Sequence, residues 1–403
     1  MDDALVPDRP ASDDATLRGS NQSGVRDHNE RIVLSLIQRH GSLASAEIAR
    51  RAGISAQTVS VIIRKLEADG LLSKGTPIRG KVGKPLVPVT INPTGVLSLG
   101  MVIGRRASEI AAIDLLGRVH ARREVVYAYP TPDKVFGFAR VALPSILAEL
   151  GPKVVARLPG LGVAAPFQLW NWLRSVNAPA DEMNAWRDLD IASTMATISG
   201  LEVLFQNDIT SACTAEHLFG RGREFADYAY FFIGSFIGGA VVLNGTVWPG
   251  RSGNAGSFGS LPMPGSGGQM TQLIDKASIY LLERQLVAAG LDPASLWTFP
   301  RDWTPFENHL APWIATTAKH LAIASVAVCS VIDFEAVLID GAFPEAVRAR
   351  LVTATRTAVS VIDTQGITAP RVEEAGVGRN ARVIGSAALP ILSKYLMSQS
   401  AFR

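Results

Sequence analysis

One aspartate in the sequence has neighbours that suggest a binding or catalytic role. Asp208 lies in "QNDITSACTAEHLFG", just after the strand-like run Val203–Phe205 and at the start of a helix-like run, Thr210–Phe219. Ligands of α/β proteins collect at the carboxyl ends of strands, so Asn207 and Asp208 are candidates for ligand contact. An Asn-Asp pair at this place is equally typical of a helix N-cap. Local physics leaves both interpretations open.

A second candidate is the glycine-rich stretch "IGSFIGGAVVLNG", residues 233–245. Glycines between β-branched residues let a backbone turn tightly and bring its N–H groups close to a phosphate, which makes Gly238 and Gly239 candidate ligand contacts. The closing Asn244-Gly245 is typical of a two-residue hairpin turn, so the stretch is also consistent with a hairpin inside a buried sheet. A short glycine cluster does not decide between these two interpretations.

The composition indicates a well-packed chain with an uneven distribution of charge. Its 403 residues allow two or three domains, 47% of them are apolar, and the mean hydropathy is +0.20. Residues 1–25 hold five acidic and two basic side chains and no apolar signal-peptide core, so we expect a disordered tail. Residues 26–92 hold eleven basic and five acidic side chains. A compact basic segment on a neutral body indicates a polyanion-binding module.

We expect a cytoplasmic protein without a disulfide framework or a membrane partner. Two cysteines, Cys213 and Cys329, cannot build such a framework. Two uncharged, apolar runs, residues 228–246 and 321–332, are better explained as interior segments. Glycines interrupt the first run, and the second is too short to cross a bilayer.

The basic segment has the pattern of a helix-turn-helix. Apolar residues at helical spacing predict a helix from Asn29 to Gly41, followed by a second over "SAEIARRAG", with Ser45 as its cap and Gly53 at its end. A third helix is predicted in "ISAQTVSVIIRKLEADGLL", with Ser55 as its cap. Two helices joined by a short turn with glycine are typical of a unit whose second helix lies in the major groove of DNA.

The next segment, "LLSKGTPIRGKVGKPLVPVTIN", predicts a strand, a basic loop and a strand, which is the pattern of a β-wing on DNA. Short polar side chains of the third helix would read base edges, and basic side chains would contact phosphates. The alternative is a basic helical hairpin that contacts another protein, but the helices, the capped turn and the wing together favour DNA. The predicted DNA contacts are Ser55, Gln57, Thr58, Ser60, Arg64 and Lys65 on the helix and Arg79, Lys81 and Lys84 in the wing.

Beyond residue 93 the pattern alternates between buried strands and helices. It predicts helices from Gln272 to Leu286 and from Pro312 to Ile332. It also predicts a buried strand in "AVLIDGAF" and a closing helix in "ARVIGSAALPILSKYL". This order places an α/β body behind the basic module.

The order of elements resembles the ROK family (repressors, open reading frames and sugar kinases), in its transcriptional-regulator branch. The motifs "QNDITSACTAEHLFG", "IGSFIGGAVVLNG" and "VGRNARVIGSAALP" carry the resemblance, which covers residues 26–395, and "GKVGKP" resembles the family's wing. The resemblance implies an α/β fold: an N-terminal winged helix-turn-helix and an actin-like, ribonuclease H-like ATPase fold of two subdomains. The expected boundaries are 26–92 for the DNA-binding domain, 93–205 and 206–385 for the subdomains, and 386–403 for a closing helix that returns to the first subdomain.

The sequence departs from the kinase members of the family. Leu99–Arg106, where they carry an Asp-Gly-Gly-Thr-type loop, has no acid and two arginines and is poorly equipped for Mg²⁺. Phe236 and Ala240 stand where the family tends to have glycine, and they would crowd a nucleotide. The family's zinc signature is absent from "SFGSLPMPGSGGQM", and Ser257–Ser260 replace its Glu-x-Gly-His element. We expect no metal, no cofactor and no enzyme activity.

These features predict a DNA-binding transcriptional regulator, a repressor of carbohydrate-related genes. The resemblance implies that Asp208, the catalytic base of kinase members, here only accepts a hydrogen bond from a polyol. The expected partners are a double-stranded DNA operator, a sugar or sugar-derivative effector, and further copies of the chain in a homodimer or dimer of dimers. Two alternatives stay open: a body that only dimerises the protein, and a residual sugar kinase. The candidate effector contacts are Asn207, Asp208, Gly238, Gly239, Ser257 and Ser260.

Overall fold

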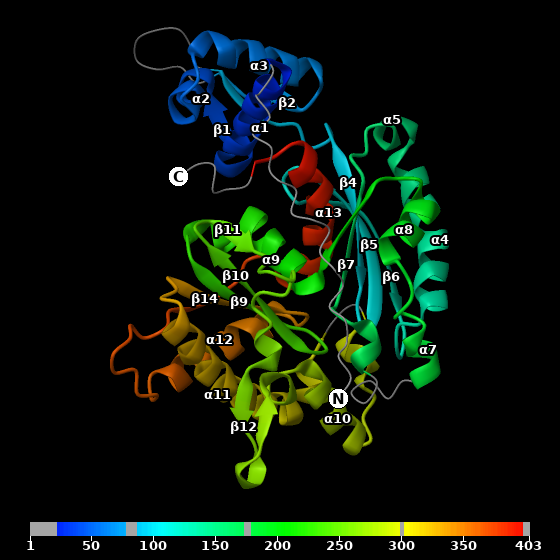
Figure 1. Cartoon of the computed structure of the whole chain (residues 1–403), viewed down its shortest axis with the longest axis vertical. Helices are drawn as coiled ribbons and strands as arrows, with labels where there is room; N and C mark the ends of the chain where they lie inside the picture. The colour runs from blue at the N-terminus through cyan, green and yellow to red at the C-terminus, as the bar shows by residue number, and fades with distance from the viewer. Residues whose placement is uncertain (1–21, 78–86, 173–178, 299–301, 398–403) are drawn as a thin grey trace.

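The computed structural model describes residues 22–77, 87–172, 179–298 and 302–397 (Figure 1). Two α/β halves form the body of the molecule, and a small N-terminal domain lies against one end of it, at the top of the view. The last helix of the chain contacts the first, so segments far apart in the sequence meet where this domain joins the body.

The N-terminal domain has the winged helix arrangement, with three helices and an antiparallel sheet in the order β1-β3-β2. Side chains of its third helix face inward as the periodicity predicts, since Val59, Ile62, Ile63 and Leu66 are buried. Ser55 caps this helix by accepting a hydrogen bond from the backbone N–H of Thr58 at 3.1 Å. The elements are α1 (Gln22–His40), β1 (Ser42–Ala44), α2 (Ser45–Ala52), α3 (Ala56–Ala68), β2 (Leu72–Lys74) and β3 (Pro88–Ile91).

Two local predictions for this domain are wrong. Helix α1 begins at Gln22 and not at Asn29, so the last residues assigned to a disordered tail are helical. Its first turns are polar, and a search for apolar spacing therefore misses them. Ser45 is the first residue of α2, and the N-cap is Ala44, whose side chain makes no capping hydrogen bond, because β1 runs directly into this helix.

The body contains the same sheet topology twice. In each half, an antiparallel meander of three strands is extended by two parallel strands, in the orders β6-β5-β4-β7-β8 and β11-β10-β9-β14-β15. This duplication is the actin-like, ribonuclease H-like fold that the family resemblance implies. The first sheet holds β4 (Leu97–Ile103), β5 (Ala107–Asp114), β6 (Val119–Val126), β7 (Leu161–Ala165) and β8 (Val203–Asn207), and the second holds β9 (Tyr228–Ile233), β10 (Ile237–Leu243), β11 (Thr246–Trp248), β14 (Ala336–Gly341) and β15 (Val372–Glu374).

Helices cover both faces of each sheet. Helices α4 (Pro132–Leu150) and α8 (Ile191–Ser199) pack on the outer side of the first sheet, and α12 (Glu345–Val359) packs on the second, with α11 (Glu307–Val331) against it. Two helices, α9 (Asp208–Phe219) and α13 (Ala381–Lys394), lie between the sheets and against each other (Figure 1). The remaining elements are α5 (Pro152–Val155), α7 (Ala180–Asn184), α10 (Ile279–Ala288) and the strand pair β12 (Pro262–Pro264) and β13 (Met270–Gln272).

Three expected boundaries shift. Strand β8 ends at Asn207, so the division expected after residue 205 would cut a strand of the first sheet. Helix α13 begins at Ala381, as the stretch "ARVIGSAALPILSKYL" predicts, so the boundary expected at residue 386 would fall inside this helix. The helix predicted from Gln272 begins only at Ile279, because Gln272 ends β13 and a short turn follows it.

The glycine-rich stretch forms a hairpin. Strand β9 turns into β10, which pairs with it antiparallel, and a second tight turn leads to β11. That second turn is Asn244-Gly245, with φ values of 52° and 65°, the left-handed conformation of a type I′ turn. The hairpin signal in the sequence is therefore confirmed.

One helical segment among the described residues, Thr304–Val331, is long and apolar enough to cross a membrane by length and composition. Half of its apolar window is buried inside the fold, where α11 packs on α12. A core helix of a soluble domain passes the same test of length and hydropathy.

Two buried carboxylates hold the loop that leads from β15 to α13. Glu216 on α9 accepts hydrogen bonds from the backbone N–H groups of residues 376–377 at 2.9 Å. Asp340 on β14 accepts one from the N–H of Gly378 at 3.1 Å. Burial raises the pKa of Asp340 to about 7, the negative charge of Glu216 adds to this effect, and Arg348 opposes it. The loop is thus fixed from both sides before α13 begins.

The substitution Asp340→Asn should flatten the pH dependence of stability between about pH 4 and about pH 7. Because the carboxyl has an ordinary pKa of 3.8 and a folded pKa of about 7, the folded state binds its proton more tightly. The free energy of unfolding therefore falls as the pH rises through this window, by no more than about 4 kcal/mol. Urea unfolding across the range measures the slope. If the free energy of unfolding depended on pH in the same way in the variant and in the unsubstituted protein, the raised pKa of Asp340 would be contradicted.

Candidate ligand cavity and nucleic-acid interface

A cavity of about 550 Å³ lies between the two halves of the body. Three neighbouring parallel strands, β4, β7 and β8, end at it, and this edge of a sheet is where α/β folds collect ligands. Arg105 follows β4, residues 166–168 follow β7, and Asn207–Asp208 connect β8 to α9. The second half contributes the turn between β9 and β10 and the loops at 254–260 and 272–274.

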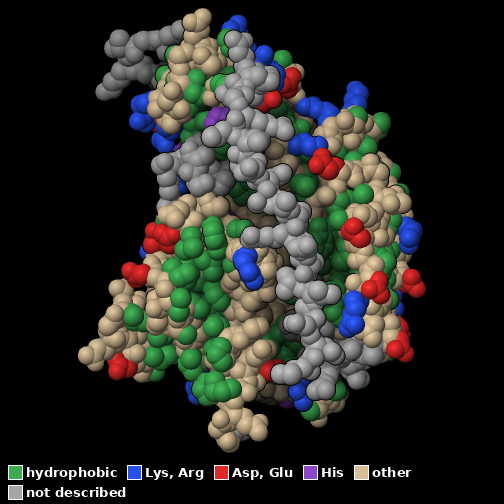
Figure 2. All heavy atoms as spheres, in the orientation of Figure 1, with side chains coloured by type: hydrophobic (Ala, Val, Ile, Leu, Met, Phe, Trp, Pro, Cys, Tyr) green, Lys and Arg blue, Asp and Glu red, His purple; other side chains and the backbone are tan. Residues whose placement is uncertain are grey.

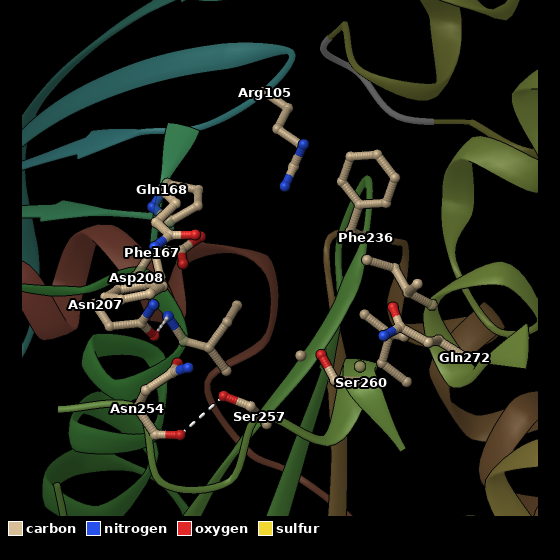
Figure 3. Close-up of a pocket in the computed structure, with 17 residues that line it drawn as sticks. Arg105, Phe167, Gln168, Asn207, Asp208, Phe236, Asn254, Ser257, Ser260 and Gln272 are labelled. Carbon is tan, nitrogen blue, oxygen red and sulfur yellow. Dashed lines mark hydrogen bonds between the residues drawn. The ribbon is translucent and has the colours of Figure 1, made fainter. Parts of the chain in front are cut away.

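The residues that the sequence singles out as effector contacts come together here. The lining includes Asn207, Asp208, Gly238, Gly239, Ser257 and Ser260. It adds side chains that the sequence did not assign to the site, namely Arg105, Gln168, Asn254, Gln272, Phe167 and Phe236 (Figure 3).

The sequence left two interpretations open for this pair, a helix cap and a position beside a ligand. In the structure Asn207 is the cap and Asp208 lines the cavity. Asn207 caps α9, since its Oδ1 accepts hydrogen bonds from the N–H groups of residues 209–210 at 3.0 and 3.1 Å. Asp208 is 4% exposed and lines the cavity, and its Oδ2 lies 3.3 Å from Nη1 of Arg382 at the start of α13. Burial raises the pKa of the Asp208 carboxyl, and the positive charges of Arg382 and Arg105 oppose this rise.

Arg105 and Phe236 lie together on one side of the cavity. Arg105 is 7% exposed, and its guanidinium carbon is 3.7 Å from the centre of the Phe236 ring, a cation–π contact. Figure 3 shows the guanidinium directed into the space between Phe236 and Asp208. Burial lowers the pKa of Arg105, yet an arginine stays protonated at neutral pH. The adjacent Arg106 is directed elsewhere and donates to the Glu283 carboxylate at 3.2 and 3.0 Å.

Neutral polar groups lie across the cavity. The Ser257 hydroxyl donates to the backbone carbonyl of Asn254 at 2.8 Å, which holds this loop in place (Figure 3). Ser260 ends a short 3-10 turn, and Gln272 ends β13. Such hydroxyl and amide groups can exchange hydrogen bonds with a small polyhydroxy ligand.

The glycines of β10 do not form an open phosphate cradle. Gly238 and Gly239 lie within the strand, opposite two Phe residues of β9. A Cβ on Gly238 would lie 2.8 Å from Cγ1 of Ile209, and a Cβ on Gly239 would overlap the ring of Phe258. Side chains of the fold therefore fill the space beside both glycines.

A magnesium nucleotide does not fit the residues present. The turn after β4 carries Arg105 and Arg106 where a carboxylate would hold the metal. Among the described lining residues Asp208 carries the one carboxylate, and Arg382 is bound to it. No group of three or more His, Cys, Asp and Glu side chains in the described part of the chain is placed to hold a metal ion.

The exposed face of α3 carries four of the predicted DNA contacts, Gln57, Thr58, Ser60 and Arg64. The Ser60 hydroxyl donates to the carbonyl of Ala56 at 2.9 Å, and Arg64 Nε donates to that of Ser60 at 3.2 Å, so both side chains follow the helix surface. Figure 2 shows Lys and Arg side chains on this domain, at the top of the view. The face has the charge and the short polar groups that a major groove requires.

Two predicted DNA contacts also have partners within the domain. Lys65 Nζ lies 2.5 Å from Glu30 and 3.5 Å from Asp69, so its charge has acidic partners within the domain. The Ser55 hydroxyl is engaged by both the backbone and the side chain of Thr58. The wing residues lie outside the described residues: Arg79, Lys81 and Lys84.

The cavity residues that sequence reasoning missed come from separate strand ends. Arg105 and Phe236 carried a usable signal, because each stands where the resemblance predicts a different residue type. Gln168 and Asn254 carried none that we could identify. Gln168 adopts a φ of 52°, which is uncommon for a residue with a side chain, and only the folded structure shows it.

The fold and its site define a winged helix joined to a duplicated α/β body. A model described as winged helix-turn-helix DNA-binding matches residues 26–73, and the ROK family model matches residues 98–274. The chain therefore carries a ROK family domain behind a DNA-binding domain, which confirms the resemblance drawn from the motifs.

Known proteins of both ROK branches are similar to the chain. It is 22% identical over 246 residues to the DNA-binding transcriptional dual regulator NagC of Escherichia coli, an alignment that spans 59% of this chain and 58% of that protein. A ROK family transcriptional regulator, a homologue of the E. coli MLC protein, superposes with a TM-score of 0.64 at 19% identity over 92% of this chain and 97% of the other. A ROK family glucokinase from Streptomyces griseus, solved with glucose and AMPPNP, superposes with a TM-score of 0.54 at 20% identity. The superposition covers 73% of this chain and 98% of the glucokinase. At these identities the solved structures establish the fold.

The substitution Gly239→Ala should destabilise the protein by about 1–3 kcal/mol, because its Cβ has no room beside Phe258. The control is Gly137→Ala in α4, where a Cβ meets no atom within 4 Å. This control should be neutral or stabilising by up to about 1 kcal/mol. Thermal unfolding of both variants measures the difference. Equal stability would show that packing does not require the glycine at position 239.

Proposed function

We propose that the protein is a DNA-binding transcriptional regulator, a repressor of carbohydrate-related genes, whose body binds a sugar or sugar derivative and transfers no phosphoryl group. The observation that carries the proposal is that both helices beginning beside the cavity, α9 and α13, end at helix α1 of the winged helix domain. Packed secondary structure thus joins a polar ligand cavity to a DNA-binding domain. The proposed setting is the cytoplasm.

Helix α3 supplies the DNA contacts in this proposal. Gln57 and Thr58 lie near base edges in the major groove, and Arg64 lies near a phosphate. A homodimer, or a dimer of dimers, has two-fold symmetry and places two copies of α3 on the half-sites of a palindromic operator.

The ends of α9 and α13 are held by α1. Arg31 donates to the backbone carbonyls of Leu392 at 2.9 Å and Leu396 at 2.5 Å, where α13 ends. Gln38 Nε2 donates to the carbonyl of Leu218 in the last turn of α9 at 3.3 Å. The last carbonyls of a helix have no partner within it, so α1 supplies a donor at the end of α13 and shares the Leu218 carbonyl with Arg223 at the end of α9. A displacement of either helix at the cavity is thereby transmitted to the winged helix domain.

A ligand regulates DNA binding here only if it binds two arrangements of the body with different affinity. The ion pair between Asp208 and Arg382 links the cavity ends of both helices. A ligand that contacts Asp208 acts on this pair and so favours one arrangement of α9 against α13. Typical couplings of this kind change affinity by about 5- to 150-fold.

Two experiments separate this proposal from its alternatives. A thermal-shift screen of sugars and phosphosugars distinguishes a body that senses a ligand from one that only dimerises. Sugar-dependent ATP turnover well above that of an Asp208→Ala variant would establish a residual kinase. The arginines after β4 and the filled space beside Gly238 and Gly239 oppose that outcome.

The substitution Arg64→Ala should weaken binding to all DNA sequences and lower the slope of log affinity against log salt concentration by about 0.9, because one phosphate contact is lost. Lys65→Ala on the same helix is the matched control. Its ammonium is already held by Glu30 and Asp69, so the slope should not change. Fluorescence anisotropy at several salt concentrations measures both slopes. A larger loss for the Lys65 variant would reverse the assignment.

The substitution Arg31→Met should weaken the regulation of DNA binding by ligand. The variant loses the hydrogen bonds from α1 to the end of α13, so the change in operator affinity caused by ligand should shrink by about threefold or more. Ligand affinity itself should stay within about twofold because the cavity is untouched. Arg26→Met on the same helix, which removes only an ion pair with Glu30, is the control. Operator titrations with and without ligand measure the effect, and full regulation in the Arg31 variant would exclude this route.

A further inference from the structure

Helix α3 carries one large apolar side chain that the winged helix domain does not bury. Val61 is 45% exposed, whereas the other large apolar residues of this helix lie in the core: Val59, Ile62, Ile63 and Leu66. Single apolar residues are common on protein surfaces, so exposure alone gives Val61 no role. Its place on the helix does.

Val61 lies at the centre of the outer face of α3. Residues three and four apart are neighbours on the surface of a helix, so Gln57 precedes Val61 on this face and Arg64 follows it. Both neighbours are exposed. The helix lies at the top of the molecule in Figure 1, away from the two α/β halves. A DNA duplex that contacts Gln57 and Arg64 therefore covers Val61 as well.

The hydroxyl groups beside Val61 are engaged within the domain. The Ser60 hydroxyl donates its one hydrogen to the carbonyl of Ala56 at 2.9 Å, so it can only accept a hydrogen bond from a base. The hydroxyls of Thr58 and Ser55 lie 2.8 Å apart and share a hydrogen bond. These hydroxyls therefore distinguish bases less well than free hydroxyls would, and an apolar contact can supply the missing discrimination.

The chemistry of the major groove gives an exposed valine one matching partner. Thymine presents a C5-methyl group there, and the groups that the other bases present are hydrogen-bond donors and acceptors. A valine against those groups would remove water from them without replacing its hydrogen bonds. The β-branched side chain of Val61 is also held near one rotamer by the helix, so a contact with a methyl group costs little side-chain entropy.

We propose that Val61 reads a thymine in each operator half-site, through contact of its methyl groups with the C5-methyl group of the base. This inference rests on the proposed function, because it names a base that the DNA-binding domain recognises. Val61 is then a specificity residue between Gln57 and Arg64.

Replacement of thymine by deoxyuridine tests the inference, because it removes the C5-methyl group and leaves the hydrogen-bonding groups of the base in place. Duplexes are first selected from a random DNA library by the full chain, and each thymine of a selected duplex is then replaced in turn. One replacement in each half-site should weaken binding by about 3- to 10-fold. Fluorescence anisotropy at one fixed salt concentration measures the affinities.

The substitution Val61→Ala shows whether this side chain makes the contact. The variant should bind the thymine duplex about 3- to 10-fold more weakly and should lose the difference between thymine and deoxyuridine at that position. Val25→Ala on α1 is the matched control, since Val25 is 44% exposed and lies on another helix, and it should keep the full difference. Alanine favours a helix, and thermal unfolding confirms that both variants are folded.

The other outcomes overturn the inference in distinct ways. Deoxyuridine without effect at every position, or an equal effect in the Val61→Ala and unsubstituted proteins, overturns the role of Val61 and leaves a DNA-binding regulator standing. Equal weakening of the thymine and deoxyuridine duplexes by Val61→Ala, with a change in oligomeric state on size-exclusion chromatography, overturns the base contact in favour of an interface between copies of the chain. Failure of the unsubstituted protein to bind any duplex overturns the proposed function as well.

Discussion

The close contact between α9 and α13 sets the positions of the other parts of the body. Gly385 of α13 faces the backbone of Ser211 on α9 so closely that a Cβ would overlap it. Gly162 of β7 meets the backbone of Ser386 in the same way. Where backbone meets backbone there is no side chain to adapt, so these two contacts hold the middle of α13 close to both the first sheet and α9. The cavity, the hairpin and the winged helix domain are all arranged around this contact.

The ion pair at the start of the two helices has a different role. A buried pair of charges adds little net stability, because the loss of hydration offsets much of the attraction. Removing one partner is costly, since it leaves the other charge uncompensated. Asp208 and Arg382 thus fix the relative position of α9 and α13 at the cavity without binding them irreversibly. A polar ligand can compete for such groups, whereas it cannot displace an apolar contact.

Patterns that depend on local physics were predicted well from the sequence. The inward face of α3, its Ser55 cap and the Asn244-Gly245 turn each follow from neighbouring residues and are confirmed. The helix expected from Gln272 was wrong because that residue pairs in β13, a contact outside its own segment. The ion pair between Lys65 and Glu30 was not predicted, because nothing near Lys65 in the sequence shows that α1 brings Glu30 beside it.

The candidate site was only half accessible to the same reasoning. Asn207 and Asp208 could be predicted from the sequence because both lie in one strand-to-helix junction. Arg105, Gln168 and Asn254 approach them from other segments, and only the parallel order of β4, β7 and β8 brings the first two to the same edge. The stretch "IGSFIGGAVVLNG" shows the converse, since its glycines suggested a phosphate loop but the described packing explains them through Ile209 and Phe258.

The apolar core groups the parts of the molecule differently from their order along the chain. Buried residues of the winged helix domain form one continuous cluster with those of the second half, whereas the first half has a cluster of its own. Yet the polypeptide leads from β3 directly into β4 of the first half. Cooperative units follow packing rather than connectivity, so the DNA-binding domain should unfold together with the distant second half. The stability of the DNA-binding domain therefore depends on residues of the second half that lie far from it in the sequence.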